Sequence, residues 1–367
     1  MSTRRRLVVS VVVVSLLVCV ATGAWAQGAR QRTRASGTSS IGTMAAGMGG
    51  AHVAVAADPT ALYWNPAGLA RQHGARLYLS AGAATENMDV LEDVGDVADI
   101  VSADDTISLG DFLLIRDLVL RNRDRPISVA GGAFAGVGLD NWAVGAYAMG
   151  GADGRLAYSA GLESGAHSER VDWSGASLVH GAAAVAYGKV IDARWDTGVT
   201  AKMAILAAST ADGYASYTVG ESNVETFSNS ANTEDDTSFT CDVGVIRHGK
   251  NGQRWALAGR NLTRPSFNLA GTTLRVDPSF DIGYAYCSGE GDIAAVDLHN
   301  VTEANDGKRE FAIGLQKRLA EGWDLRFGYG NDQPTLGLGV NAGFLAVGLA
   351  VTPGSRDRLV VSLGAEL

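Results

Sequence analysis

The sequence predicts an all-β protein: a transmembrane antiparallel β-barrel of about fourteen strands, with an N-terminal segment in its lumen. Three observations lead to this prediction. Apolar residues recur with a period of two from about residue 126 onward, the segments of strand length are even in number, and the connections alternate between long and short. Because period two alone also suits a soluble sandwich with one wet face, the connections must decide between the two folds.

The chain begins with the features of a secretory signal peptide. Residues 4–6 are arginines, residues 7–20 are continuously apolar, and residues 24–26 read Ala-Trp-Ala, a small-x-small cleavage site. The apolar segment is too short to span a membrane as a helix. We therefore expect residues 1–26 to be removed on export. The mature chain then has a formal net charge of −12 (the −9 of the whole chain minus three arginines), which disfavours nucleic acid as a partner.

Period-two alternation gives each strand segment one apolar and one polar face. In the segment 323–330, Trp323, Leu325, Phe327 and Tyr329 share a face, and the opposite face is polar or small. Most segments have about 9–12 residues, the length that a tilted membrane strand needs. We predict strands at 75–84, 127–138, 142–151, 178–190, 194–206, 238–248, 253–262, 278–287, 291–299, 309–318, 323–330, 334–340, 343–351 and 358–366.

The connections favour the barrel over the sandwich. Long connections at about 86–126, 152–177 and 207–237 alternate with turns of three or four residues, and the alternation persists through the tenth connection. Outer-membrane barrels combine short periplasmic turns with longer external loops, whereas a sandwich has no reason to alternate. We therefore assign residues 73–367 to an outer-membrane barrel with both termini on the periplasmic side.

The first long connection, 86–126, is acidic and has a helical pattern. Its valines at 90, 94, 97 and 101 recur at spacings of three and four. We expect a partly helical external insertion, which either lies over the barrel mouth or docks a partner.

A glycine-rich stretch precedes the first strand and belongs to neither the signal nor the barrel. Residues 47–69 read GMGGAHVAVAADPTALYWNPAGL. Their glycines permit positive φ and close backbone approach. Asp58 can cap a short helix at 60–64 with Pro59 in its first turn, and Asn65-Pro66 ends it. From the residues alone, the segment 27–72 is either a plug in the lumen or a loop and helix packed on a soluble core.

The same stretch resembles the N-terminal signature of the FadL-type outer-membrane barrel superfamily. That superfamily includes fatty-acid and aromatic-hydrocarbon channels, PorV/PorQ-type proteins and TraF-like proteins of conjugal transfer. A second segment, RNLTRPSFN at 260–268, is similar to one in the PorV- and TraF-like branch. The residues that match the signature are Gly47, Gly49, Gly50, Ala51, Asp58, Asn65, Pro66, Ala67 and Gly68, and all of these but Ala51 form what we call the hatch motif.

The resemblance covers essentially the whole mature chain and implies a barrel with a hatch, residues 27–72, in its lumen. In the transport branch, apolar molecules bind inside the barrel and leave sideways into the membrane. In the PorV-like branch, the barrel acts with secretion machinery. For either branch the implied partners are outer-membrane lipid and the barrel-assembly machinery.

Motifs for catalysis, metals and cofactors are missing from the sequence. It contains no G-x-S-x-G, H-E-x-x-H or P-loop pattern, and its histidines show no metal spacing. Asp297 and His299 share one strand face, which we interpret as a solvated polar wall of the lumen rather than a catalytic pair. We expect no enzyme and no cofactor. Cys241 and Cys287 fall on opposite strand faces near opposite ends of the barrel, so we expect two free thiols.

Two groups of residues are candidates for the lumen. Charges of both signs on inner faces indicate a self-paired polar interior, which suits a plugged barrel; they include Arg194, Asp196, Lys202, Asp242, Asp324 and Arg326. Apolar residues of the hatch either line a ligand pocket or form the hatch's own core; they are Val53, Val55, Leu62, Tyr63 and Trp64.

Two functions are open at this point, both at the bacterial outer membrane. The first is a hatch-gated passage or binding site for hydrophobic or amphipathic small molecules. The alternative is a structural or partner barrel of a secretion or surface-assembly system, with no transport of its own and with its recognition surface on the external loops.

Overall fold

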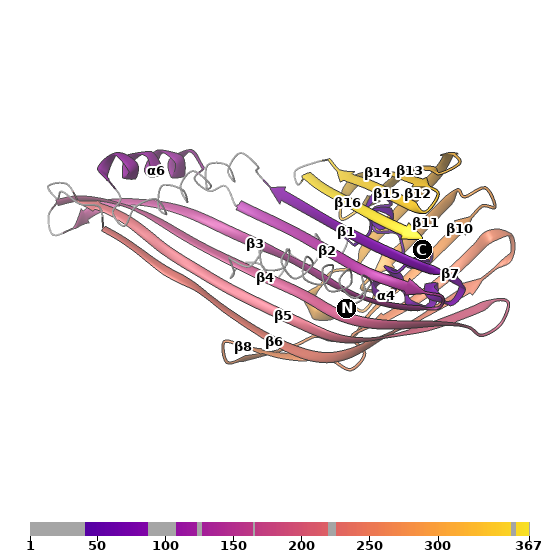
Figure 1. Ribbon diagram of the computed structural model, residues 1–367. Coiled ribbons are helices and arrows are strands. Elements are labelled where there is room, and N and C mark those ends of the chain that lie inside the picture. Colours follow the sequence, from indigo (N-terminus) through magenta and orange to yellow (C-terminus); the bar gives the residue numbers. More distant parts are fainter. Residues whose placement is uncertain are drawn as a thin grey trace, which may run out of the picture.

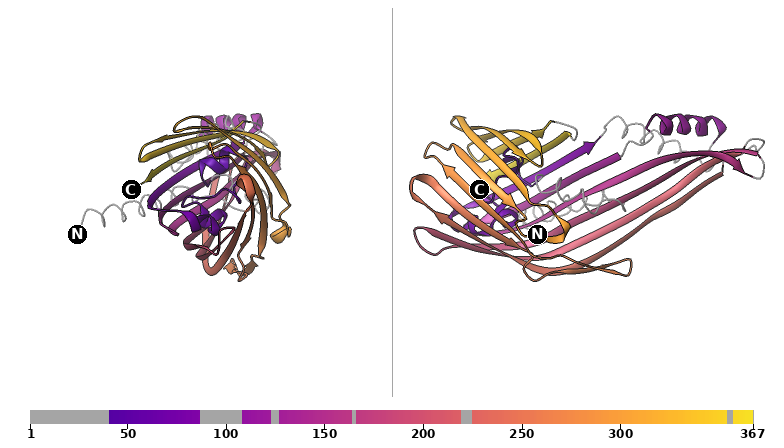
Figure 2. Two further views of the ribbon diagram at one scale, coloured as in Figure 1. Left: turned by 90° about the vertical axis from the view of Figure 1, so that its right-hand side faces the viewer. Right: turned by 180° about the vertical axis from the view of Figure 1, so that it is seen from behind.

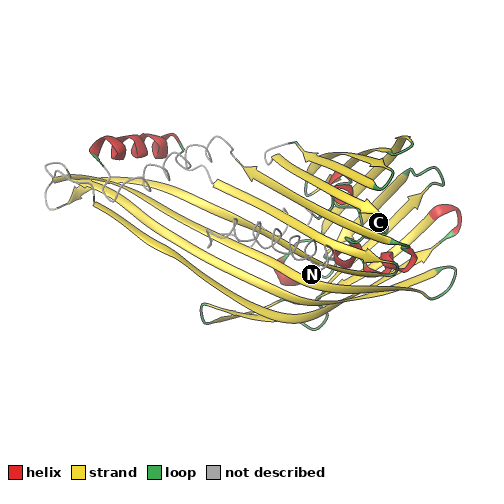
Figure 3. Cartoon of the chain, viewed as in Figure 1, coloured by secondary structure: helices red, strands yellow, loops and turns green. Residues whose placement is uncertain are grey.

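Fourteen antiparallel strands close into a barrel in the computed structural model, which describes residues 41–86, 108–122, 127–163, 166–218, 225–353 and 357–366. Each strand pairs with the next barrel strand in the sequence, and the first pairs with the last to close the ring. The expected signal peptide and residues 27–40 lie outside the described residues. Figure 3 shows that the described chain is mostly strand. The predicted fold, a closed antiparallel barrel of fourteen strands, is confirmed.

Ten of the barrel strands follow the predicted segments closely, and the other four, β3 to β6, begin or end near the predicted bounds on one side only. They are β1 (Ala75–Glu86), β2 (Ile127–Leu139), β3 (Trp142–Glu163), β4 (Ala166–Val190), β5 (Trp195–Thr218), β6 (Glu225–His248), β7 (Gln253–Arg260), β10 (Ser279–Cys287), β11 (Ile293–His299), β12 (Glu310–Ala320), β13 (Trp323–Gly330), β14 (Gln333–Ala342), β15 (Leu345–Thr352) and β16 (Asp357–Glu366). Single turns of 3-10 helix, η3 (Lys250–Gly252) and η4 (Ala304–Asp306), lie in two connections.

Four neighbouring strands are much longer than predicted. The expected loops 152–177 and 207–237 are mostly strand, because β3, β4, β5 and β6 run for 22, 25, 24 and 24 residues. At about 3.3 Å per residue, 24 residues extend roughly 80 Å, far beyond the hydrocarbon core of a bilayer. Each long strand pairs with a long neighbour, so the ladder continues past the membrane. Figure 1 shows these strands projecting beyond the rest of the barrel.

A helix covers part of this projection. Helix α6 (Leu109–Arg121) begins in a capping box, in which Ser108 Oγ accepts from the N–H of Asp111 and Asp111 Oδ2 accepts from the N–H of Ser108, both at 3.2 Å. Its buried face, including Phe112, packs near Val171 and Ala215 of the projecting sheet rather than over the barrel mouth. The valine pattern at 90–101 lies outside the described residues. No helix in the described ranges is long and apolar enough to cross a membrane.

The outer face of the barrel carries a belt of exposed apolar side chains. On β5 it runs from Trp195 to Ile205, which is about 33 Å along the strand, or about 25 Å high at a tilt near 40°. That height matches the lipid-facing band of membrane barrels. Other exposed members of the belt are Trp142, Val144, Val185, Val199, Met203, Val243, Trp255, Leu257, Ile282, Val296, Ile313, Leu315, Trp323, Phe327, Leu336, Leu349 and Val361.

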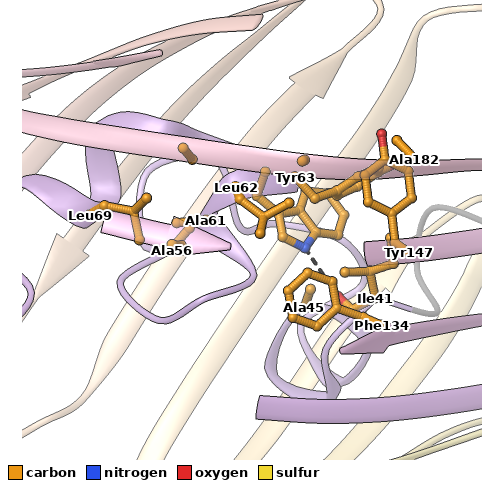
Figure 4. Close-up of a cluster of buried hydrophobic side chains, with 14 residues drawn as sticks. Ile41, Ala45, Ala56, Ala61, Leu62, Tyr63, Leu69, Phe134, Tyr147 and Ala182 are labelled. Carbon is orange, nitrogen blue, oxygen red and sulfur yellow. Dashed lines mark hydrogen bonds between the residues drawn. The ribbon is translucent and has the colours of Figure 1, made fainter. Parts of the chain in front are cut away.

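The described part of the hatch, residues 41–72, lies in the lumen. It contains α3 (Thr43–Gly47), α4 (Ala61–Trp64) and the 3-10 helix η2 (Pro66–Arg71), which lie inside the ring of strands in the axial view on the left of Figure 2. The largest buried cluster joins the hatch to the wall. In Figure 4, Tyr63 of the hatch lies near Tyr147 of β3, with ring centres 5.0 Å apart, and the dashed line marks the 3.1 Å bond from Trp64 Nε1 to the carbonyl of Ile41. The hydrophobic core of the molecule is therefore the interface between hatch and barrel.

Candidate functional site

Glycines seat the hatch against β13 and β14. A Cβ on Gly47 would lie 2.9 Å from the Cα of Gly337, and one on Gly49 would lie 2.6 Å from the backbone N and C of Tyr329. Gly49 also has a φ of +67°, which side chains of L-residues rarely adopt. The stretch is thus free of bulk because its backbone lies directly on the backbone of the wall.

The Asn-Pro-Ala-Gly block makes an equally close contact with β4, β5 and β6. Asn65 is fully buried and begins η2, where its Oδ1 accepts from the N–H of Ala67 (3.1 Å) and its Nδ2 donates to the carbonyl of Val53 (3.0 Å). A Cβ on Gly244 would lie 1.9 Å from Asn65 Oδ1, and one on Gly198 would lie 2.2 Å from the carbonyl carbon of Pro66. Gly68 is equally constrained, with the carbonyl oxygen of Ala56 at 2.0 Å from such a Cβ.

The helix expected at 60–64 is one residue shorter. Helix α4 begins at Ala61, and Asp58 caps the turn that leads into it: its Oδ1 accepts from the N–H of Thr60 at 2.8 Å and its carbonyl from the N–H of Ala61 at 2.9 Å. Asn65 is extended (φ −162°, ψ 106°) and ends the helix before Pro66, as expected from the restriction that proline places on the residue before it.

A cavity of about 1570 Å³ lies between the hatch and an inward-folded hairpin. This volume exceeds the range of about 300–1,000 Å³ of most small-molecule sites. Tyr63 and Trp64 of the hatch and Tyr147 of the wall line it on one side. Phe267 and Leu274 line it on the other. Aromatic and aliphatic side chains therefore face the cavity from both the hatch and the hairpin, and polar and charged side chains line much of the rest.

The hairpin that roofs the cavity is β8 (Ser266–Leu269) with β9 (Thr272–Arg275), in a connection predicted as a loop. Phe267 packs on Ala204 and Leu206, which are buried residues of β5. Carboxylates on the free edge of β6 hold the hairpin: Asp236 accepts from the N–H of Asn268 at 2.7 Å, and Glu234 accepts from the N–H of Ala270.

Paired charges stand at the edge of the cavity floor. Lys202 Nζ lies 2.8 Å from Asp242 Oδ1 and 3.0 Å from Asn261 Oδ1. Arg260 Nη2 lies 2.8 Å from Asp281 Oδ2, and the Arg260 guanidinium carbon is 4.6 Å from the centre of the Tyr63 ring. Lys202 and Arg260 therefore each have a carboxylate partner, so these two cations are neutralised where they face the cavity.

Asp297 and His299 on β11 are not a solvated wall, which corrects the expectation from the sequence. Asp297 is fully buried, and its Oδ2 accepts from the N–H groups of His52 (2.6 Å) and Val53 (2.7 Å). His299 Nε2 lies 3.2 Å from the carbonyl oxygen of Gly50. Both residues face the hatch because the chain of the hatch passes close to β11.

The other charged residues expected in the lumen divide into two groups. Asp196 is buried and binds Arg71 of η2 at 2.8 Å and His248 at 2.6 Å. Asp324 and Arg326 are buried on the inner face of β13, and Lys202 and Asp242 are buried as described above. Arg194 is placed wrongly by the sequence prediction: β5 begins at Trp195, and Arg194 is exposed in the preceding turn.

The five apolar hatch residues also divide. Tyr63 and Trp64 line the cavity. Leu62 lies in the first core cluster, and Val53 and Val55 lie in a second cluster between hatch and wall.

Cys241 and Cys287 are free, as predicted. In the parts of the chain that the structure describes, no three His, Cys, Asp or Glu side chains are grouped to hold a metal.

Sequence reasoning missed Arg260, Asp281 and the roofing hairpin. Arg260 is the first residue of the segment RNLTRPSFN. This segment was identified from the sequence by its resemblance, but no role was assigned to Arg260. Alternate residues of β7 face the lumen. Ala256 and Ala258 are buried there, so Arg260, two residues further on, lies on the same face. Its pairing with Asp281 depends on the register between β7 and β10, which sequence alone does not set.

Solved structures share this architecture, although no protein-family model and no curated protein matches the chain. The Ralstonia pickettii toluene transporter TbuX aligns with a TM-score of 0.52 and 11% identity, over 90% of this chain and 99% of that one. The P. putida toluene transporter TodX gives 0.52 and 12%, again over 90% and 99%. The chain has the fold of these channels. A monoaromatic hydrocarbon channel, CymD, aligns with a TM-score of 0.51 and 11% identity, over 90% and 98%. These likenesses give no support to the PorV- and TraF-like branch.

Proposed function

We propose that this chain is an outer-membrane channel that binds small hydrophobic or amphipathic molecules and lets them pass. The observation that carries the proposal is the large cavity between the hatch and the β8–β9 hairpin, which presents aromatic and aliphatic side chains from both of them. It lies inside a barrel with a lipid-facing belt. The fold shared with structures described as toluene transporters and hydrocarbon channels supports this function, and it supports a role without catalysis.

Three features of the lumen fit such a passage. The long strands β3 to β6 extend the wall outward beyond the belt, so that a molecule meets the barrel wall before it reaches the membrane. The molecule can bury its apolar surface against the aromatic side chains of Tyr63, Trp64 and Tyr147. Such burial stabilises the bound state by about 25 cal/mol per Å² of apolar surface removed from water. The hatch closes the floor, so passage requires part of the hatch to move.

The cellular setting belongs to the same proposal. Residues 1–26 direct export and are removed, residues 27–72 form the hatch, and residues 73–367 form a FadL-type barrel. The barrel-assembly machinery inserts this barrel, and outer-membrane lipid surrounds it. Residues 86–126 form an external insertion.

A binding measurement tests the cavity directly. The purified barrel in lipid nanodiscs is titrated with a radiolabelled monoaromatic hydrocarbon and, separately, with a radiolabelled fatty acid. We expect saturable binding of at least one of them, weakened by Phe267→Asp in the cavity roof. Thr273→Asp, on the same hairpin but outside the cavity lining, is the matched control and leaves binding unchanged. A folded barrel that binds neither probe contradicts the proposal.

A further inference from the structure

We propose that Asp297 and His299 form a latch that holds the hatch closed under the cavity floor. The proposal rests on the proposed function, because a latch matters only where the hatch gates a passage. Asp297 and His299 are positioning residues: they hold hatch backbone and act on a passing molecule only through it.

Asp297 is the central part of the latch. Its side chain is fully buried, and one oxygen, Oδ2, accepts two short bonds from consecutive N–H groups of the hatch. Bonds to a carboxylate are stronger than those between neutral groups. The other oxygen, Oδ1, has no hydrogen-bond partner among the described residues. Glycine at 283 makes room for this arrangement, because a Cβ there would lie 2.6 Å from Asp297 Oδ1.

His299 connects the latch to the cavity. Its Nε2 lies 3.2 Å from the carbonyl oxygen of Gly50, and its Nδ1 lies 3.5 Å from Asp281 Oδ2. Its ring centre is 6.0 Å from that of Trp64. Gly50, Trp64 and His299 all line the cavity, so a molecule in the cavity touches the latch itself.

The rest of the hatch is held in a different way. At Gly47, Gly49 and Asn65 the backbone or side chain of the hatch lies in close contact with the wall. Gly50 is the exception. Its φ is +95°, and the nearest atoms to a Cβ there would be 3.8 Å away. The turn at 50–53 therefore combines a glycine at positive φ, a looser contact with the wall at Gly50 than at Gly47 or Gly49, and a few hydrogen bonds to β11. We expect it to be the part of the hatch that opens at least cost.

A single-cysteine labelling experiment tests the latch. Cys241 and Cys287 are replaced by serine, and Ala51→Cys places a reporter beside Gly50, at a position that is fully buried. The folded barrel is treated with a membrane-impermeant maleimide. We expect Asp297→Ala to raise the labelling rate about tenfold or more, because two hydrogen bonds to a buried carboxylate are lost. His299→Ala is expected to raise it as well.

Two further variants make the test specific. Asp297→Asn keeps a carbonyl oxygen at the Oδ2 position, so it still accepts both bonds and raises the rate much less than Asp297→Ala. Asp196→Ala removes an equally buried carboxylate that holds the far end of the hatch through Arg71. It is expected to leave the labelling rate at position 51 unchanged. No increase with a folded Asp297→Ala barrel overturns the proposal, and so does an equal increase with Asp196→Ala.

A second measurement covers the case in which Asp297→Ala does not fold, as judged by heat-modifiable gel migration. In the unmodified barrel, the latch predicts faster amide hydrogen exchange at 50–54 than at 43–48 and 61–68. The reverse order overturns it. Neither measurement uses a ligand. A barrel that binds no hydrocarbon but gains labelling with Asp297→Ala would therefore remove the proposed function and leave the latch standing.

Discussion

Asn65 of the hatch occupies the space that a side chain on Gly244 of β6 would need: a Cβ there would lie 1.9 Å from Asn65 Oδ1. The contact joins a residue of the hatch motif to a wall residue far along the chain. It explains why the motif and the glycines of the inner wall must occur together, and the first two predictions follow from it.

Gly244→Ala should unseat the Asn65 end of the hatch. The added methyl group overlaps Asn65 Oδ1 and approaches Pro66 Cδ at 2.9 Å, so we expect a loss of about 1–3 kcal/mol, typical of overpacking. Urea unfolding followed by heat-modifiable migration measures it. Gly161→Ala in β3, where a Cβ meets nothing within 4 Å, is the control and should be close to neutral. Equal stability of the two variants would contradict the contact.

Asn65→Ala removes both hydrogen bonds of the capping side chain. Two buried backbone groups, the N–H of Ala67 and the carbonyl of Val53, lose their partner, which costs about 1–3 kcal/mol for each group left unsatisfied. Asn65→Asp keeps the acceptor for Ala67 and loses only the donor to Val53. We expect it to be intermediate in limited proteolysis of the hatch. If Asn65→Asp proved as sensitive to the protease as Asn65→Ala, the bond to Val53 would be the dominant one.

Acid should loosen the hatch through His52. Burial of the ring lowers the pKa of His52 from 6.5 to about 4, with Arg326 acting in the same direction and Asp58 opposing. A displaced hatch therefore takes up a proton between pH 6.5 and 4 that the seated hatch does not, and stability of the seated state falls as the pH falls through this range. The loss is about 2 kcal/mol at about pH 5, and it is absent at about pH 7.5.

His52→Gln isolates this effect from other titrating groups. The free energy of unfolding in urea is measured for both proteins at about pH 7.5, above the ordinary His pKa, and at about pH 5, between that value and the lowered pKa of the seated His52. The unmodified barrel should lose more stability between the two pH values than the glutamine variant does. An identical pH dependence would mean that His52 does not carry the effect.

The apolar belt makes a prediction about membrane insertion. Leu257→Arg, on the outer face of β7, should destabilise the barrel in lipid by about 2–4 kcal/mol, the cost of an arginine at mid-membrane depth. Leu162→Arg is the matched control, because Leu162 is also exposed but lies at the end of the projecting strand β3. Refolding yield into liposomes should fall for the first variant only. Equal yields would place Leu257 outside the bilayer.

Strand positions were predictable because period two depends only on which face each residue occupies. The same reasoning predicted β3 to β6 too short. Strand length was limited to what crosses a membrane, and the projecting halves of these strands consist mostly of polar and small residues without a clear apolar alternation. The hairpin β8–β9 was missed because strands of four residues carry too little periodicity.

The candidate site was predictable only in part. The glycine and Asn-Pro-Ala-Gly motif located the hatch, but its partners Gly244, Gly198 and Gly337 are set by register and by how the hatch lies in the lumen. Arg194 was misplaced because a strand boundary moved by one residue. The role of Asp297 could not be read from its strand, because its partners are backbone N–H groups of a segment 244 and 245 residues away.

Uptake of a labelled monoaromatic hydrocarbon into liposomes that hold the purified barrel tests the central claim most directly. The account predicts saturable uptake by the intact protein, reduced by Phe267→Asp and not by Thr273→Asp. No uptake above empty liposomes, by a barrel shown to be folded by heat-modifiable migration, would contradict it.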